Sequence, residues 1–576
     1  MDALIAILAR RPWVAAGAFV VLGIAAVHGR ALTFPFAWDD GALVAESPLI
    51  AAPEGLGAAL AAALESDFWG GSAQPYASGM YRPAVIATYL LERAAFGPSP
   101  VGPHALNLLL HLGVALLLLL LARRLGAGPL PAALAAGLFA LHPVVVMPAV
   151  NVTSRTDPLA ALFLLLALHA ALGLRRAPLA ALGAAAGLLL ALLSKESAVA
   201  GGAALGLLAL LPAGTPGLPE RSRGERALLL AALALATALY LALRWRALGS
   251  LWPEAPAYTE AALAPGGPLA FLAGPELTLR YAVLALVPVG LSVVHPLPEP
   301  GPLLGGAALA LLLAAGALLW RRDARRGLLA LGWFVLALLP VTGWLAAPAR
   351  FTQLYLYLPL LGVAALGAVW LRSRRALAVA AVLLGPFVLG SVSRVAVWSS
   401  GLALWQDAAA ANPADPSVQL NLGNALLEAG REGEAREALT FALEQALEQN
   451  RRGTAAKAAL SLGNQARKAG ALPLARGFLA EAARLSEDKL GAALINLSLV
   501  TADLGDLRAA EDAARRAITT LPGDARAHVA LGVALARQAR FAEARAPFEA
   551  ALRLDPANAD AKRSLQRLDQ VEANGG

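Results

Sequence analysis

The sequence contains no cysteine, which excludes disulfide bonds, thiol catalysis and cysteine-ligated metals but fits any cellular compartment. It is also poor in charge, since Asp, Glu, Lys and Arg make up 15% of its 576 residues. No Gly-x-Gly-x-x-Gly turn follows a strand-like segment, so the fingerprint of a dinucleotide-binding fold is missing. The missing fingerprint argues against a soluble nucleotide-sugar donor.

Apolar residues are in excess, at 58% with a mean hydropathy of +0.62, against about 45–50% in a soluble domain. The excess lies in residues 1–400, which carry 26 basic and 17 acidic side chains, whereas residues 401–576 carry 21 and 22. The sequence therefore predicts two all-α domains, a polytopic membrane bundle (1–400) and a second helical domain (401–576). The basic balance is interpreted as loop charge at one membrane face, with no nucleic-acid partner.

Membrane-spanning helices of about 20 apolar residues each are predicted throughout residues 1–400. The eleven predicted spans lie near 12–30, 104–122, 127–146, 157–174, 177–194, 197–213, 226–245, 301–320, 327–346, 353–371 and 376–398. The first resembles a signal peptide, but we interpret it as a retained span. Pro268–Val294 is apolar yet contains Pro275, Glu276 and Arg280. It either spans or re-enters, and we interpret it as an interfacial helix with a re-entrant piece.

Basic clusters follow alternate predicted spans and set the predicted orientation. They are Arg10–Arg11, Arg123–Arg124, Arg175–Arg176, Glu220–Arg226, Arg321–Arg326 and Arg372–Arg375. By the positive-inside rule these clusters are cytoplasmic. The chain is therefore predicted to be integral to a lipid bilayer, with a cytoplasmic N-terminus and with everything after Trp398 on the outer side.

Residues 417–558 repeat with a period near 34. The anchors are Leu422-Gly423, Leu462-Gly463, Leu497-Ser498 and Leu531-Gly532. A turn residue follows (Gly430, Gly470, Gly505 and Arg540), and then a small residue (Ala435, Ala475, Ala509 and Ala544). This pattern is typical of tetratricopeptide repeats, which bury their faces by stacking. It predicts an α-solenoid of about four repeats with a protein- or peptide-binding groove; the alternative is a rigid spacer.

Ionisable residues close to a membrane are costly, so they are candidate functional residues. The first group is Asp39 and Asp40, beside Trp38 and directly after the first span. Partial burial and like charge raise a carboxyl pKa, which suits a general base that takes a proton from a hydroxyl. The alternative is an ordinary Asp-Asp-Gly turn.

The second group is Arg82 with His104, Asn107 and His111, three residues that share one helix face. This stripe lines either a polar cavity or a helix–helix contact. The two histidines are seven residues apart, which is too far for a one-turn metal clamp. No dedicated metal site is predicted, and a divalent cation stays an open alternative.

The remaining two groups border later outer loops. His142 ends one span, and Arg155 and Asp157 begin the next; the guanidinium fork of Arg155 suits a diphosphate or carboxylate. Lys195 and Glu196 lie between two apolar runs. The lysine either holds a phosphate as a point charge or snorkels to the interface with its neighbour.

Read in order, these motifs resemble the transmembrane and tetratricopeptide repeat-containing O-mannosyltransferases and their bacterial relatives. The matching residues are Phe36, Asp39 and Asp40; Tyr81, Arg82 and Pro83; His104, Asn107 and His111; Leu138, Phe139, His142 and Pro143; Arg155 and Asp157; Lys195 and Glu196; and Tyr357, Leu358 and Pro359. The resemblance covers nearly the whole chain, including the repeats.

The resemblance implies a GT-C fold in a bacterial inner membrane and inverting transfer of a mannose-like hexose. The donor would be a polyprenyl-phosphate-linked sugar, and the acceptor a hydroxyl of a protein Ser/Thr or a glycan on the non-cytoplasmic side. Asp39 would be the base, with Asp40 as second choice. Lys195, Glu196, Arg155 and Arg82 would hold the donor phosphate. The site would be shaped by His104, Asn107, His111, His142, Asp157 and Arg350.

The sequence departs from the family at two places. Met147 stands where the family tends to have Glu, and Gln353 and Leu354 stand where it tends to have Glu-Arg. Arg350 lies about one helical turn upstream and could substitute for that arginine. These changes leave the donor and acceptor identities open but retain the paired aspartates.

Two other functional classes are weighed against the enzyme. A non-catalytic membrane scaffold would use the repeats to gather partners for envelope assembly, and it would not need the outer acidic and basic groups. A transporter or flippase for lipid-linked sugars would need polar residues deep within its spans, and few occur in the middle of the fourth to seventh spans.

Overall fold

The computed structural model describes residues 10–52, 54–72, 78–210, 220–251, 272–295, 302–342 and 351–573. Within these ranges every regular element is a helix, and the only β-bridge is the isolated pair His295–Phe351. The all-α prediction is confirmed. The chain divides into two compact units, Met1–Leu404 and Trp405–Gly576, which are described separately.

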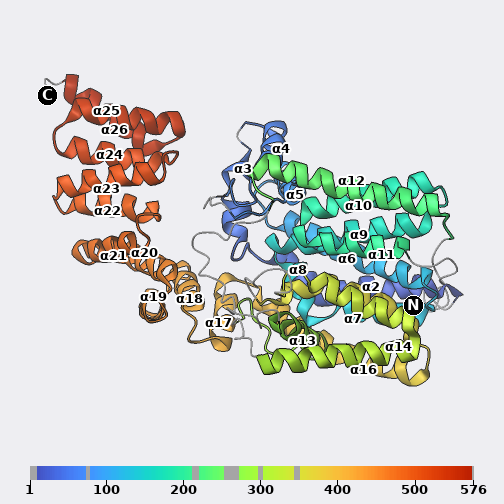
Figure 1. Cartoon of the computed structure of the whole chain (residues 1–576). Helices are drawn as coiled ribbons and strands as arrows, with labels where there is room; N and C mark the ends of the chain where they lie inside the picture. Colours follow the sequence, from blue (N-terminus) through green and yellow to red (C-terminus); the bar gives the residue numbers. More distant parts are fainter. Residues whose placement is uncertain are drawn as a thin grey trace. The chain divides into compact units, whose positions relative to one another are not determined.

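Seven helical segments of the first unit are long and apolar enough to cross a membrane. They contain α2 (Pro12–His28), α6 (Val101–Arg124), α9 (Thr156–Gly173), α10 (Ala177–Ser194), α12 (Arg223–Leu248), α15 (Tyr357–Trp370) and α16 (Arg374–Val397). Each coincides with a predicted span to within a few residues. Figure 1 shows α6, α9, α10 and α12 lying side by side.

One predicted span, 127–146, is broken. The chain runs through α7 (Pro129–Ala140), the short 3₁₀ turn Pro143–Val145 and α8 (Val146–Val150), with a 54° bend at the break. His142 caps the turn, because its Nδ1 accepts the backbone N–H of Val144 at 3.2 Å. Counted as one span, this pair brings the crossings among the described residues to eight.

Two further predicted segments contain only short helices in the described ranges, and a third helix covers two predicted spans. The segment after Pro268 forms α13 (Ala273–Leu286), and predicted span 197–213 contains α11 (Val199–Leu210); at 1.5 Å per residue each is about 20 Å long, shorter than a bilayer core. α14 (Pro302–Leu338) covers two predicted spans.

The backbone of α14 doubles back on itself. A straight helix would separate Gly316 from Leu331 by roughly 22 Å, yet a Cβ on Gly316 would lie 3.4 Å from Leu331 Cδ2. The two apolar arms, Leu303–Leu318 and Leu329–Leu338, therefore pack against each other, as expected for a hairpin around the basic cluster.

Small helices occupy the loop between the first two long helices. They are the π-turn η2 (Gly41–Ala45), α3 (Pro48–Ala51), α4 (Leu56–Glu65) and α5 (Pro83–Phe96). A separate apolar core that includes Leu43, Ile50, Phe68 and Tyr89 holds them together. Figure 1 shows α3 and α4 at the opposite end of the bundle from the N-terminus.

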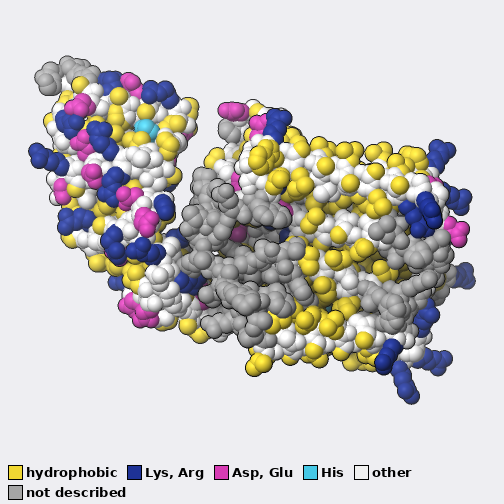
Figure 2. All heavy atoms as spheres, in the orientation of Figure 1, with side chains coloured by type: hydrophobic (Ala, Val, Ile, Leu, Met, Phe, Trp, Pro, Cys, Tyr) yellow, Lys and Arg dark blue, Asp and Glu magenta, His cyan; other side chains and the backbone are white. Residues whose placement is uncertain are grey.

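Apolar and basic side chains occupy different parts of the surface of the first unit. Apolar side chains cover its flank, and Lys and Arg gather at the end that carries the N-terminus (Figure 2). Exposed flank residues include Leu182, Leu235 and Val382, at 66%, 71% and 73% exposure. Such a surface is costly in water, so it indicates association with a membrane.

The second unit is a solenoid of paired helices (Figure 1). Its elements are α17 (Gly401–Ala411, which begins in the first unit), α18 (Pro416–Glu428), α19 (Glu432–Glu448), α20 (Arg452–Lys468), α21 (Leu472–Leu485), α22 (Gly491–Asp503), α23 (Leu507–Thr520), α24 (Ala525–Arg537), α25 (Phe541–Leu554) and α26 (Ala559–Ala573). The anchor glycines allow close packing within each pair: a Cβ on Gly423, Gly463 or Gly532 would lie 2.5–2.7 Å from a partner side chain.

Two positions of the predicted repeat need correction. Gly430, Gly470 and Gly505 have positive φ at the turn, but in the last repeat the residue with positive φ (62°) is Ala539, not Arg540. In the third repeat the fully buried small residue is Ala510, whereas Ala509 is half-buried. In every repeat, the residue with positive φ lies seven positions after the second anchor residue.

Candidate functional site

Asp40 is buried, with 1% of its surface exposed. Its Oδ1 accepts from Asn151 Nδ2 at 3.0 Å and from the backbone N–H of Thr153 at 2.8 Å, and its Oδ2 accepts from the N–H of Ala37 at 3.3 Å. Burial raises the pKa of Asp40 to about 6, although the hydrogen bonds oppose the rise. Asp40 therefore ties the loop after α2 to the loop that precedes α9.

Asp39 is half-buried, and so it is the more accessible of the two aspartates. The preceding residue, Trp38, has a φ of 56°. This left-handed conformation costs a bulky residue about 1–3 kcal/mol and is concentrated at functional sites. The Trp38 ring lies 6.5 Å from the ring of Trp398, at the end of α16. The strained turn thus presents Asp39 next to an aromatic pair.

Arg155 is fully buried, and its guanidinium joins three segments. Nε donates to Asn107 Oδ1 at 2.7 Å, and Nη2 donates to the carbonyl of Pro103 at 2.9 Å. Nη1 donates to Thr88 Oγ1 at 2.8 Å and to Glu92 Oε2 at 2.5 Å. With its donors engaged inside the protein, Arg155 positions α5, α6 and the loop before α9. Its role as a phosphate ligand stays a prediction.

The predicted stripe on α6 makes contacts with neighbouring segments. Asn107 Nδ2 donates to the carbonyl of Asn151 at 2.7 Å. His104 Nδ1 lies 3.0 Å from the carbonyl of Val150 and so donates to it, which leaves Nε2 buried without a partner. Both residues therefore hold the Asn151 loop, which also binds Asp40.

The other two predicted histidines have fixed tautomers. His111 Nε2 donates to the carbonyl of Ala140 at 3.0 Å, so its Nδ1 accepts from the Tyr357 hydroxyl at 2.8 Å. His142 Nε2 donates to the carbonyl of Ala285 at 2.9 Å and joins the bend after α7 to α13. Both rings are buried and shape the bundle around the site.

Lys195 and Asp157 form a buried ion pair across 38 residues of sequence. Lys195 Nζ lies 2.7 Å from Asp157 Oδ1 and 2.6 Å from Oδ2. Burial lowers the pKa of Lys195, and the Asp157 carboxylate opposes that shift. The ammonium also lies 5.4 Å from the centre of the Tyr355 ring. Lys195 is therefore held in place by α9 and by an aromatic face.

Glu196 lies between two arginines. Its Oε2 accepts from Arg82 Nε at 3.1 Å, and its Oε1 accepts from the backbone N–H of Tyr81 at 2.8 Å and lies 3.8 Å from Arg244 Nη1. Burial alone would lower the pKa of Arg82, but the Glu196 carboxylate raises it overall. Glu196 is 30% exposed and Arg82 15%, so this group is open on one side.

Arg244 is a further residue of the site, and none of the sequence motifs contains it. It ends the apolar run of α12, and a single arginine in an apolar span is itself a signal of function. Arg244 is 2% exposed and also donates to the carbonyls of Gly79 and Leu251. α12 thus contributes a third cation to the groups predicted from the motifs.

The acidic and basic groups belong to one neighbourhood. Tyr89 on α5 donates to the carbonyl of Val152 at 3.3 Å and interacts electrostatically with Asp40, Arg82 and Arg155. Among the predicted site residues, Arg350 lies outside the described residues. No group of three or more potential metal ligands occurs in the ranges that the structure covers.

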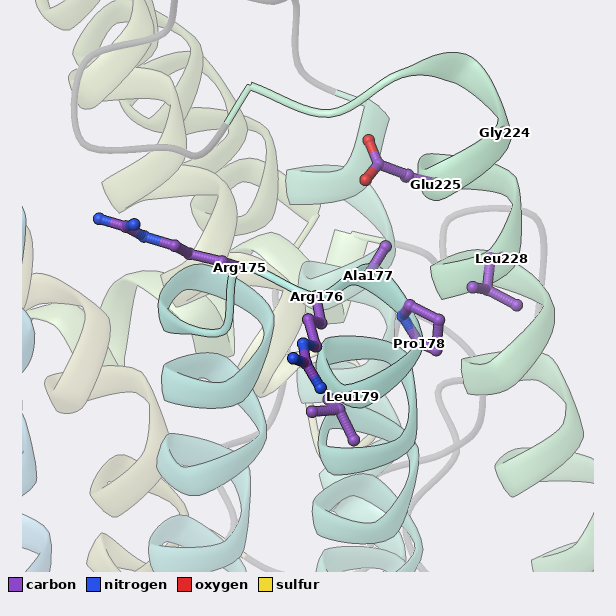
Figure 3. Close-up of a pocket in the computed structure, with 8 residues that line it drawn as sticks. All are labelled: Arg175, Arg176, Ala177, Pro178, Leu179, Gly224, Glu225 and Leu228. Carbon is purple, nitrogen blue, oxygen red and sulfur yellow. The ribbon is translucent and has the colours of Figure 1, made fainter.

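A cavity of about 680 Å³ lies elsewhere in the bundle (Figure 3). It is lined by the N-terminal residues of α10 and α12, with Arg175 and Arg176 on one side and Gly224, Glu225 and Leu228 on the other. These residues begin the helices whose opposite ends carry Lys195 and Arg244. The cavity is therefore separate from the candidate site.

The fold thus comprises one unit with helices of membrane-spanning length and apolarity and a second unit of tetratricopeptide repeats. Residues 398–440 and 497–559 match the family model described as tetratricopeptide repeat. Among solved structures, the Arabidopsis OM64 TPR domain is 27% identical, covering 21% of this chain and 98% of that one, with a TM-score of 0.20. The MamA protein is 23% identical over 27% and 82% of the two chains, with a TM-score of 0.24.

Two curated relatives are protein O-mannosyl-transferases. The human Protein O-mannosyl-transferase TMTC4 is 32% identical over 164 residues, which is 26% of this chain and 22% of that protein. The Drosophila melanogaster Protein O-mannosyl-transferase Tmtc1 is 33% identical over 99 residues, or 17% and 12%. The chain thus matches about a fifth or less of the length of these relatives.

Proposed function

We propose that this protein is a membrane glycosyltransferase that moves a hexose from a polyprenyl-phosphate donor to a hydroxyl group at the non-cytoplasmic face. The observation that carries the proposal is one neighbourhood of charges: Tyr89 interacts electrostatically with Asp40 and Arg82, and Glu196 joins Arg82 to Arg244. Asp39 directly precedes Asp40 in the chain. Partial similarity to two protein O-mannosyl-transferases supports a mannose-like sugar and a protein acceptor.

Asp39 is the proposed general base. In an inverting transfer, the acceptor oxygen bonds to the anomeric carbon as the bond from that carbon to the phosphate oxygen breaks. The hydroxyl proton passes to Asp39, and the polyprenyl phosphate leaves with the electron pair. Asp40, whose oxygens are engaged by Asn151, Thr153 and Ala37, positions the loop and is not the base in this proposal.

Cations stabilise the leaving phosphate in this proposal. Charge-assisted hydrogen bonds from guanidinium and ammonium groups are the strong interactions available for a phosphate. Arg82 is partly open, and Lys195 is anchored by Asp157. Five further residues hold the surrounding loops and helices in position in this proposal: Arg155, His104, Asn107, His111 and His142.

The repeats are proposed to present the acceptor. Tetratricopeptide repeats bind peptides and proteins in a groove, so a protein acceptor would be held by residues 405–576 while its hydroxyl reaches the membrane unit. A membrane scaffold that only gathers partners would use the same groove without transferring sugar.

The test is sugar transfer in membranes that contain the full chain. Polyprenyl-phosphate mannose or glucose, labelled in the sugar, is incubated with these membranes and with membranes that lack the protein. Label should appear in the protein or glycan fraction, with release of unlabelled polyprenyl phosphate. If neither donor gives label above the protein-free control while the chain is folded and inserted, the scaffold function is favoured.

A further inference from the structure

Glu196 has the surroundings of a bound phosphate. Two guanidinium groups, from Arg82 and Arg244, and the backbone N–H of Tyr81 converge on its two oxygens at 3.1, 3.8 and 2.8 Å. Guanidinium forks and backbone N–H groups are also the groups with which proteins bind phosphate oxygens. A carboxylate of this chain thus occupies a site built for an oxyanion.

The charged side chains around Glu196 carry a net positive charge, which favours the binding of another anion. Arg82, Arg244 and Lys195 supply three positive charges, while Glu196 and Asp157 supply two negative ones. Asp157 is fully engaged by Lys195, at 2.6 and 2.7 Å. Glu196 is therefore the carboxylate that can leave, and it is 30% exposed while the two arginines are 15% and 2% exposed.

Two buried donors on α12 are incompletely used in this arrangement. Arg244 Nη1 lies 3.8 Å from Glu196 Oε1, beyond hydrogen-bonding distance, and the hydroxyl of Tyr240, one helical turn earlier, interacts with the Arg244 guanidinium, which offers its proton no acceptor. Their residues are 2% and 4% exposed. Leaving a buried polar group unpaired is unfavourable, and a phosphate, with more acceptor oxygens than a carboxylate, would pair both.

We infer that Glu196 is an internal stand-in for the donor phosphate, which replaces the Glu196 carboxylate between Arg82 and Arg244 when the lipid donor binds. Arg244 is then a phosphate ligand that the sequence motifs did not identify. The inference rests on the proposed function for the identity of the lipid, but the anion site itself is argued from these contacts alone. Competition by Glu196 weakens donor binding and helps the phosphate leave after transfer.

The experiment measures binding of farnesyl phosphate to the purified full-length protein in detergent by titration calorimetry, with farnesol as the uncharged control. Glu196→Gln keeps the side-chain shape and removes the competing charge. It should bind farnesyl phosphate at least about fivefold more tightly than wild type, which is what a unit charge about 4 Å away is worth even in water. Binding of farnesol should be unchanged.

The same titration tests Arg244 against a matched residue. Arg244→Met should bind farnesyl phosphate about tenfold or more weakly, since a buried charged ligand is lost. Arg246→Met is the control, because Arg246 lies on the same helix but is 74% exposed and pairs only with Glu65 among the described groups; its affinity should stay within about twofold of wild type. If Arg244→Met does not fold, Arg244→Lys, which retains the charge, should give an intermediate affinity.

Each outcome decides a point. Equal or weaker binding by Glu196→Gln would overturn the stand-in, since Glu196 would then only hold Arg82 in place. Equal binding by Arg244→Met and Arg246→Met would remove Arg244 from the site. If the expected binding pattern is found but no labelled sugar is transferred by wild type, the proposed function fails and the phosphate site stands.

Discussion

The buried pair of Arg155 and Glu92 gives the sharpest prediction about stability. Arg155→Met removes four hydrogen bonds, to Asn107, Thr88, Glu92 and Pro103, and leaves a carboxylate that is 5% exposed without its partner. Breaking a buried ion pair in this way typically costs about 3–5 kcal/mol. Methionine fills much of the volume of the arginine stem, so most of this cost comes from the unpaired charge rather than from a cavity.

A second substitution separates charge from shape. Burial already raises the pKa of Glu92, and Arg155 opposes that shift, so removing the arginine makes the ionised carboxylate less favourable still. Glu92→Gln in the Arg155→Met background should therefore recover about 1–3 kcal/mol. Arg30→Met, at an exposed arginine in the same unit, serves as the control and should be close to neutral.

The assay is thermal unfolding of the full chain in detergent, followed by tryptophan fluorescence. Arg155→Met should melt about 5 °C or more below wild type, and the double variant should melt in between. An Arg155→Met protein that melts like wild type but no longer binds farnesyl phosphate would refute this reasoning. Arg155 would then be the phosphate ligand that its sequence motif suggested.

Three further predictions concern other buried groups. Folding raises the pKa of Asp40 from 3.8 to about 6, so this carboxyl binds its proton more tightly in the folded chain, and its contribution to stability falls as pH rises from about 4 to 6. Asp40→Asn should remove that part of the pH dependence of the melting temperature. An unchanged pH profile would contradict this prediction. Tyr357→Phe leaves His111 Nδ1 without its donor and should cost about 1–3 kcal/mol in the same melting assay, whereas an unchanged melting temperature would rule out this hydrogen bond. Gly532→Ala places a Cβ 2.6 Å from the Phe548 ring and should destabilise the last repeats by about 1–3 kcal/mol. The expected result is faster proteolysis of residues 405–576. The control is Gly523→Ala, where an added Cβ meets nothing within 4 Å, and this variant should be cleaved like wild type.

The long helices could be predicted from sequence because a span is a local property. An uninterrupted apolar run such as that of α6 or α10 needs only its own backbone hydrogen bonds to be stable in a bilayer. The break after α7 was harder to predict, since the run from 127 to 146 stays apolar across it. Pro143 and the capping by His142 explain the 54° bend only once the position of the histidine ring is known.

The candidate site was predictable as a set of residues but not as a set of contacts. The motifs contain Asp157 and Lys195, but their ion pair joins residues 38 apart in sequence, and no local pattern fixes it. Arg155 was predicted as a phosphate ligand from its motif, whereas its complete burial and its hydrogen bonds to α5 and α6 are tertiary properties that the motif does not contain. Arg244 was not predicted as a site residue because it lies in an apolar run that was assigned as a span. Only the cost of placing a charge within a membrane indicates a function for it.

The most direct test of the proposed mechanism is sugar transfer by Asp39→Asn, with Glu46→Gln as a matched control, because Glu46 is an exposed carboxylate in the same loop after α2. Both variants are assayed with labelled polyprenyl-phosphate hexose after confirming wild-type expression and melting temperature. The account predicts that Asp39→Asn loses about 10²-fold or more of the transfer rate, as expected for removal of a general base, while Glu46→Gln retains it. Equal transfer by the folded Asp39→Asn protein and wild type would contradict the assignment of Asp39 as the base.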